Sequence, residues 1–475
     1  KYIKANNSNW SEIFVCLEND CNLPAETDID YNGYYFDLSK NELTSAVKIK
    51  KLDLTQAVNL RKIEDYAFSE SPLISVLFNE GLETIGEDAF SSCQLENIDL
   101  PKSLTTIGAY AFDENPLKNV TILDNITSLG NYAFGNIENL TIGMSVIPEN
   151  GFGDITNLHV LNTVTSIDSD SFGDIENLTI EMKNIPRMAF YYNVGLKKVT
   201  LEGVESIGES AFEYCRQIEK LVIPNSVIYV GHNAFSDTGL GEIEILSKNL
   251  TMDSYAFGSS SLDKLIVGIE NVPANAFSMA INDLVLLDTV KTIGYSAFRD
   301  VRNSVVIPSS VKEIGGGTHF QGVKKMTIGM ENIPVAIANH HNLETLELLD
   351  TVRTIGDYAF DHTLLTELII PNGVTTIGRS SFQANKITKL MIPSSVTTIG
   401  DEAFSGNLIS NLSIESGVTE IGLRTFAYNQ IANLSLPNSL IEIGQCAFEQ
   451  SQISNLTIPN SVQTIGNGAF KYNQI

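Results

Sequence analysis

A unit of 22 residues recurs along most of this chain, and it limits the fold more than any other feature. The last copy starts at Ile453, and steps of 22 residues toward the N-terminus reach apolar residues at Ile431, Ile409 and Ile387. A fixed period of this size is typical of a stacked solenoid, because one unit cannot bury its apolar face and needs its neighbours to do so. The sequence therefore predicts one repeat array rather than several globular domains.

Phenylalanine marks the same position in nearly every unit. Nineteen of the 22 phenylalanines follow the repeat, at positions 68, 90, 112, 134, 152, 172, 190, 212, 235, 257, 277, 298, 320, 360, 382, 404, 426, 448 and 470. Ala338 takes this position in one degenerate unit, which brings the count to about twenty units of 18–23 residues. Since each buried Phe, Ile or Leu contributes about 1.5–3 kcal/mol, stacked columns of these side chains are expected to form the core.

Each unit from Leu52 onward reads as a strand, a turn, an apolar anchor and a second turn. In the pattern Leu-x-x-Leu-x-Ile, the last two apolar residues face one way and the residue between them faces the other. Strands one repeat apart are predicted to pair in parallel and to form a continuous sheet on one face, with irregular turns and little helix. The predicted solenoid spans residues 51–475, with shortened, irregular units within 135–349, where proline replaces the glycine of the anchor.

Residues 1–50 do not fit the repeat. They contain the only tryptophan, Trp10, and the pair Cys16 and Cys21. Because the terminal unit of a solenoid lacks one neighbour, we expect this segment to be an N-terminal cap, with a separate small binding domain as the alternative. Whether Cys16 and Cys21 form a disulfide stays open. The chain begins at Lys1 and stops at the first column of another unit, which suggests a piece of a longer precursor.

The charge of the chain excludes some partners. A formal net charge of −27 argues against binding to nucleic acid or an anionic membrane, because both need clustered Lys and Arg. The sequence also lacks an uninterrupted apolar run of about 18 residues, so no membrane insertion is predicted.

Few residues suggest chemistry. Cys93 and Cys215 stand three residues after a marker phenylalanine, a position that asparagine holds in other units, and are predicted to be buried, unreactive thiols.

His340 and His362 occupy one column of adjacent units, with His341 and His319 nearby, so that a transition-metal site is one interpretation and a solvated turn the other. We assign no catalytic, cofactor-binding or metal-binding residues, and the chain is predicted not to be an enzyme; a carboxylate-based hydrolase is the remaining alternative.

The repeat resembles a known family. The pattern Leu-x-x-Leu-x-Ile-Pro-x-Ser-Val-x-x-Ile-Gly-x-x-Ala-Phe is similar to the leucine-rich repeat of the BspA-like bacterial surface proteins, over residues 52–475. The resemblance implies a leucine-rich-repeat solenoid outside the cell or on its surface. It also implies an adhesin that contacts host matrix proteins or other cells. A structural spacer that displays another domain is the alternative.

One column of strand residues is the candidate partner-binding site. The residue between the two inward positions of each strand faces outward, and in most units it is Thr. Five consecutive strands instead carry Val222, Glu244, Ile266, Val285 and Val306, and adjacent exposed apolar side chains often mark an interaction surface. The charged residues Lys220, Lys264, Glu242 and Asp283 would form its rim. The alternative is that Val and Ile stand there for their strand propensity alone.

Overall fold

The computed structural model describes residues 15–16, 50–258, 261–316, 320, 322–338 and 342–475. The chain forms a parallel β-solenoid of about 19 turns, and no helix occurs among these residues. It divides into two compact units, the first made of Lys1–Leu240 and Met252–Gly258 and the second of Gly241–Thr251 and Ser259–Ile475. The predicted solenoid fold is therefore confirmed.

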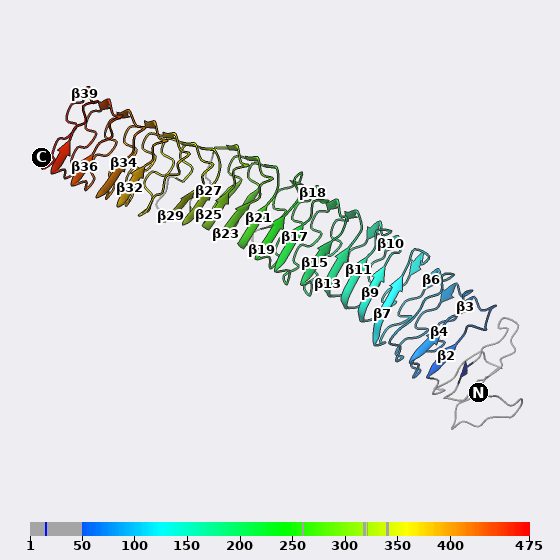
Figure 1. Ribbon diagram of the computed structural model, residues 1–475. Helices are drawn as coiled ribbons and strands as arrows, with labels where there is room; N and C mark the ends of the chain where they lie inside the picture. The colour runs from blue at the N-terminus through cyan, green and yellow to red at the C-terminus, as the bar shows by residue number, and fades with distance from the viewer. Residues whose placement is uncertain (1–14, 17–49, 259–260, 317–319, 321, 339–341) are drawn as a thin grey trace, which may run out of the picture. The chain divides into compact units, whose positions relative to one another are not determined.

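The longer strands follow the Leu-x-Ile pattern and form the sheet face of each unit (Figure 1). The first unit contains β2 (Lys51–Asp53), β4 (Ser75–Leu77), β7 (Leu117–Ile122), β9 (Ile137–Ile142), β11 (Ile155–Val160), β13 (Ile175–Ile180), β15 (Lys198–Leu201) and β17 (Lys220–Ile223). The second unit contains β19 (Glu242–Ile245), β21 (Leu262–Val267), β23 (Phe277–Leu286), β25 (Phe298–Ile307), β27 (Lys325–Ile328), β29 (Thr345–Leu348), β32 (Lys389–Ile392), β34 (Asn411–Ile414), β36 (Asn433–Ser435) and β38 (Asn455–Thr457).

A second row of strands forms at the apolar anchors, and the sequence did not predict it. Each of these strands has two residues, of which the second is the anchor. The first unit contains β3 (Lys62–Ile63), β5 (Thr84–Ile85), β6 (Thr106–Ile107), β8 (Ser128–Leu129), β10 (Val146–Ile147), β12 (Ser166–Ile167), β14 (Asn184–Ile185), β16 (Ser206–Ile207) and β18 (Tyr229–Val230), and β20 (Thr251–Met252) has one residue in each unit. The second unit contains β22 (Asn271–Val272), β24 (Thr292–Ile293), β26 (Glu313–Ile314), β28 (Asn332–Ile333), β30 (Thr354–Ile355), β31 (Thr376–Ile377), β33 (Thr398–Ile399), β35 (Glu420–Ile421), β37 (Glu442–Ile443) and β39 (Thr464–Ile465).

The glycine after the anchor allows successive turns to approach each other closely. A Cβ atom on Gly400 would lie 2.4 Å from the backbone nitrogen of Arg379 and 2.7 Å from the carbonyl carbon of Gly378. Both atoms belong to the preceding turn, and backbone atoms cannot move aside as a flexible side chain can. Glycine at this position therefore lets the turn that carries β33 pack closely against the turn before it.

Parallel pairing keeps equivalent residues in register. In the first unit the order β15-β13-β11-β9-β7 forms a five-stranded sheet, in which Leu158 pairs with Leu140 on one side and Leu178 on the other. In the second unit β23 and β25 extend to ten residues each, with register shifts between them. One antiparallel pair occurs among the described strands, where β1 (Val15–Cys16) joins the edge of β2. The rest of the predicted cap, including Cys21, lies outside the described residues, so its boundary at residue 50 stays a prediction.

The core of each unit is a ladder of phenylalanine rings. In the first unit the rings of Phe90 and Phe112 stack with centroids 5.3 Å apart and planes 4° apart. In the second unit Phe382, Phe404 and Phe426 stack with centroids 5.5 and 5.6 Å apart, and all three side chains are fully buried. The predicted columns therefore form the core as expected, and each ring gains contact from the turns on both sides.

The turn around each phenylalanine has an unusual backbone. Residues two positions before and two positions after the marker commonly have positive φ, although most of them are not glycine; Glu402 has φ 59° and Tyr428 has φ 59°. Such left-handed residues cost about 1–2 kcal/mol each when they carry a Cβ atom. The cost is offset by hydrogen bonds between turns, because Glu402, Phe404 and Gly406 donate their N–H groups to carbonyls of Leu423, Thr425 and Ala427.

Two substitutions test this account of the turn. Gly406 has φ 73° and a new Cβ atom there would meet nothing closer than 3.6 Å, so Gly406→Ala should lower the stability by about 1 kcal/mol through the backbone alone. Ala384, at the same position one turn earlier, has φ 54°, and Ala384→Gly should raise the stability by a similar amount. Urea denaturation of both variants measures the difference. A loss of stability in both variants would contradict the left-handed turn.

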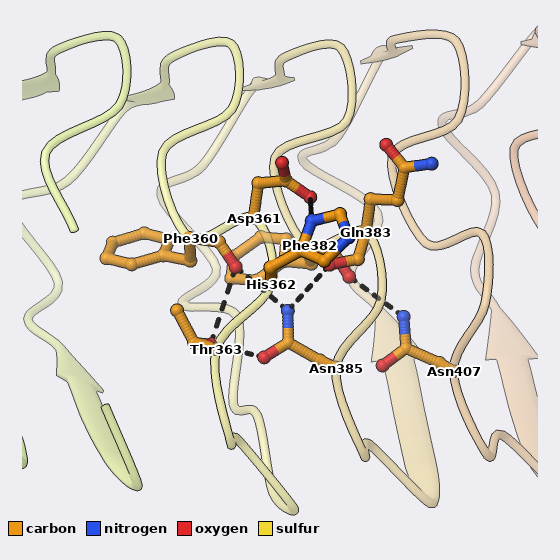
Figure 2. A network of polar contacts seen from close by, with 8 residues as sticks. All are labelled: Phe360, Asp361, His362, Thr363, Phe382, Gln383, Asn385 and Asn407. Atoms are coloured by element: carbon orange, nitrogen blue, oxygen red, sulfur yellow. Dashed lines mark hydrogen bonds and ion pairs between the residues drawn. The ribbon is translucent and has the colours of Figure 1, made fainter. Parts of the chain in front are cut away.

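A column of buried polar side chains follows the phenylalanines by three residues (Figure 2). Asn385 donates from Nδ2 to the carbonyl of Phe360 at 2.8 Å, and its Oδ1 accepts from the N–H of Leu365 at 3.3 Å. Asn407 makes the same contacts one turn later, with the carbonyl of Phe382 and the N–H of Ile387. These amides satisfy backbone groups that the solenoid buries between two turns.

Candidate functional site

The structure places four of the five candidate residues in one column. Glu244, Ile266, Val285 and Val306 lie on the neighbouring strands β19, β21, β23 and β25, and each pairs with the next in the sheet register. The residues on either side of them in each strand, such as Leu265 and Val267, are fully buried. The four residues therefore face outward, as the alternation of inward and outward residues along each strand predicted. We call Ile266, Val285 and Val306 the apolar stripe.

Exposure differs along the apolar stripe. Val306 is 36% exposed, whereas Ile266 and Val285 are half-buried. Val222 on β17 also is 36% exposed and belongs to the first unit. Whether these residues bind a partner stays a prediction.

Polar side chains border the apolar stripe. Lys264 pairs in register with Asp283, as the predicted rim requires. Asp283 accepts hydrogen bonds from Asn303 at 2.7 Å and from Ser304. At the far end of the column, Val306 is followed by Thr327, whose hydroxyl donates to Glu347 at 3.0 Å. The stripe thus lies between Glu244 and Glu347, with a hydrogen-bonded polar edge beside it.

Sequence reasoning missed two more apolar residues of the same column. Ile369 is 82% exposed, and Met391 on β32 is 59% exposed. Met391 pairs with Ser413 of β34, so it takes the outward position of its strand. Both are more exposed than any residue of the apolar stripe. The outward strand position that predicts Val285 and Val306 also predicts Ile369 and Met391 when it is followed along the sequence beyond Thr327.

The candidate reactive residues are consistent with a structural role. Cys93 and Cys215 are fully buried, and their thiols donate to the carbonyls of Phe68 and Phe190, as asparagine does elsewhere in this column. Burial raises the pKa of Cys215 to about 12 and also raises the pKa of Cys93, so neither forms a thiolate near neutral pH. The prediction of buried thiols is confirmed.

The histidine column can be followed only in part. His362 Nδ1 lies 2.7 Å from an oxygen of Asp361 (Figure 2), whereas His319, His340 and His341 lie outside the described residues. Within the described part of the chain, no three His, Cys, Asp or Glu side chains lie close enough to hold a metal ion. No helix among those residues is long and apolar enough to cross a membrane.

The repeat geometry agrees with a comparison of the sequence with protein families. The profile of the BspA type leucine-rich repeat region matches residues 38–152, 145–263, 270–387, 331–438 and 353–475. The chain belongs to this family. A comparison of the sequence with curated proteins found no match.

Solved structures of leucine-rich repeat proteins are similar to this BspA-type chain. One from Eubacterium ventriosum is 19% identical with a TM-score of 0.28, covering 63% of this chain and 83% of its own. One from Bacteroides ovatus is 18% identical with a TM-score of 0.24, covering 94% and 92%. A leucine-rich cell surface protein from Faecalibacterium prausnitzii is 18% identical with a TM-score of 0.22, covering 69% and 86%.

Proposed function

We propose that this BspA-type protein is a binding scaffold outside the cell or on its surface, and that it acts as an adhesin for host matrix proteins or other extracellular proteins. The observation that carries the proposal is the apolar stripe on the sheet face of the second unit. Three β-branched side chains in register form a small apolar surface, and the hydrogen-bonded polar groups of Asp283, Asn303 and Ser304 lie along one edge of it. An apolar centre with a polar rim is the usual composition of a protein interface.

The chain as a whole supports a protein partner over other classes. Its net charge of −27 opposes nucleic acid and anionic lipid, because binding to either depends on neutralising phosphates. The rigid stacking of the repeats also favours recognition, since a partner that docks on a preformed sheet does not have to order it first. Ile369 and Met391 extend the same chemistry to further turns of the second unit.

The triple substitution Ile266→Thr, Val285→Thr and Val306→Thr tests the proposal. Threonine keeps the β-branch and the strand propensity, while its hydroxyl removes the apolar surface. We expect the intact chain to bind at least one of a panel of purified matrix proteins, such as fibronectin, laminin and collagen, on a biosensor surface. The triple variant should bind that protein at least tenfold more weakly, at an unchanged melting temperature.

A matched control separates the apolar stripe from apolar exposure in general. Val58 is 66% and Val146 is 49% exposed, and both lie outside the stripe, so Val58→Thr and Val146→Thr should leave binding unchanged. Equal binding by the triple variant and the unmodified chain would place the site elsewhere. No binding of the unmodified chain to any protein of the panel would contradict the proposed adhesin function.

A further inference from the structure

The sheet face of the first unit has a different chemistry from the apolar stripe of the second unit. A groove of about 680 Å³ lies over β9, β11, β13 and β15. Its outward side chains are amides and hydroxyls in two parallel rows, together with one imidazole and two charged groups. The lining residues that project into it are Asn139, Asn157, Asn177, Thr141, His159, Thr179, Thr200, Lys198 and Glu202. We call this the polar groove.

The first row of the polar groove is a continuous chain of amide hydrogen bonds. Asn177 donates from Nδ2 to Oδ1 of Asn157 at 3.0 Å, Asn157 donates to Asn139 at 2.8 Å, and Asn139 donates to Asn119 at 3.1 Å. All donations point the same way, so that the amides polarise one another. The chain fixes the side chains at the spacing of the strands, about 4.8 Å. It also ends at Asn177, whose register partner is Lys198 rather than another amide.

The second row presents hydroxyl groups that the protein does not use. Thr141, His159, Thr179 and Thr200 are consecutive register partners and are all half-buried. Within the described part of the chain, the hydroxyls of the three threonines make no hydrogen bond. By contrast, two threonines in the turns, Thr163 and Thr165, donate to backbone carbonyls at 2.6 and 2.8 Å.

His159 is held in place between two of these hydroxyls. Its Nε2 lies 2.8 Å from Oε1 of Glu181, which holds the ring at the groove and leaves Nδ1 for another partner. Half-buried hydroxyls and a ring nitrogen without protein partners are hydrated in the free protein. A ligand that offers hydroxyl groups at a similar spacing can replace several of these waters and reproduce their hydrogen bonds.

We propose that the polar groove binds an uncharged linear oligosaccharide. Such a ligand presents hydroxyl or acetamido groups at nearly every ring, each able to donate and accept, and the two rows offer both functions along four strands. The carbonyl oxygen of Asn177 at the end of the amide chain is placed to accept from an N-acetyl group. This site is separate from the protein-binding stripe and does not depend on it.

Other ligand classes fit the polar groove less well. A protein partner needs apolar or aromatic anchors, and no outward-facing side chain in the groove is apolar. Nucleic acid needs several cations, whereas Lys198 is the one cationic residue among those that line the groove. An anionic polysaccharide would face Glu202 and Glu181 as well as Lys198. An uncharged oligosaccharide needs neither apolar anchors nor several cations, and the two glutamates do not repel it.

The test uses the intact chain and five hexasaccharides of glucose, mannose, xylose or N-acetylglucosamine: cello-, laminari-, manno-, xylo- and chitohexaose. Isothermal titration should detect binding of at least one of them. The double substitution Thr141→Val and Thr179→Val removes two hydroxyls at constant shape and should weaken that binding at least tenfold. The melting temperature of the variant reports whether the sheet is intact.

Two controls decide the outcome. Thr457 takes the same outward strand position on β38, so Thr457→Val should bind the sugar as the unmodified chain does. The triple threonine variant of the apolar stripe should also bind it normally, which separates this site from the proposed function. The proposal is overturned if none of the five sugars binds at millimolar concentration, or if the folded Thr141→Val, Thr179→Val variant binds as tightly as the unmodified chain.

Discussion

Replacing Phe404 with alanine is expected to lower the free energy of unfolding by about 3–5 kcal/mol. The ring is fully buried and stacks on Phe382 at 5.5 Å and on Phe426 at 5.6 Å, so its removal leaves a cavity that neither neighbouring turn can fill. Both neighbours are held by their own hydrogen bonds between turns, which prevents collapse. Urea denaturation followed by circular dichroism measures the loss, and Phe404→Leu should recover more than half of it.

The same substitution at Phe320 should cost less. The ring of Phe320 lies 6.5 Å from that of Phe298, a wider spacing than at Phe404, and the next unit carries Ala338 instead of a ring. Phe320 therefore stacks on its preceding ring less closely than a ring in the regular part of the ladder does, although it too is buried. Equal losses at Phe404 and Phe320 would show that the turns around Phe320 are packed as tightly as the regular turns around Phe404.

The parts of the fold that depend on periodic burial could be predicted from the sequence. Phe404, its anchor Ile399 and the strand residue Leu412 recur at fixed spacing, because each must face the interior of every turn. The left-handed turns could not be predicted, since residues such as Glu402 and Tyr428 do not favour positive φ. Hydrogen bonds between turns override that local preference, and they exist only after the units have stacked.

The candidate site was predictable in register but not in exposure. Alternation along a strand is enough to place Ile266 and Val285 on the outward side, because the period of a strand is two residues. How far each side chain is exposed depends on its neighbours across the sheet, which leaves Val285 half-buried and Ile369 82% exposed. The polar groove depends on contacts between successive repeats, such as the chain of amide hydrogen bonds through Asn157. Which hydroxyl groups lack a hydrogen-bond partner can therefore be seen only in the structure.

Replacing Asn407 with alanine is expected to cost about as much as the loss of a core phenylalanine, although no apolar contact is removed. The side chain is 3% exposed, and Nδ2 donates to the carbonyls of Phe382 at 2.8 Å and Phe404 at 3.1 Å. Its Oδ1 accepts from the N–H of Ile387 at 3.2 Å. Alanine would leave two buried backbone groups without a partner, the carbonyl of Phe382 and the N–H of Ile387, whereas the carbonyl of Phe404 still accepts from Asn429 at 3.0 Å. At about 1–3 kcal/mol for each group, we expect a total loss of about 3–5 kcal/mol.

The chain itself supplies the matched control for Asn407. Ser451 occupies the same position two turns later, where its hydroxyl donates to the carbonyl of Phe426 at 2.8 Å. Asn407→Ser keeps one of the three hydrogen bonds and should therefore lose clearly less stability than Asn407→Ala in the same urea titration. If the two variants lose the same amount, the cost at this position comes from the lost volume of the side chain, and the hydrogen bonds between turns do not stabilise the solenoid as we infer.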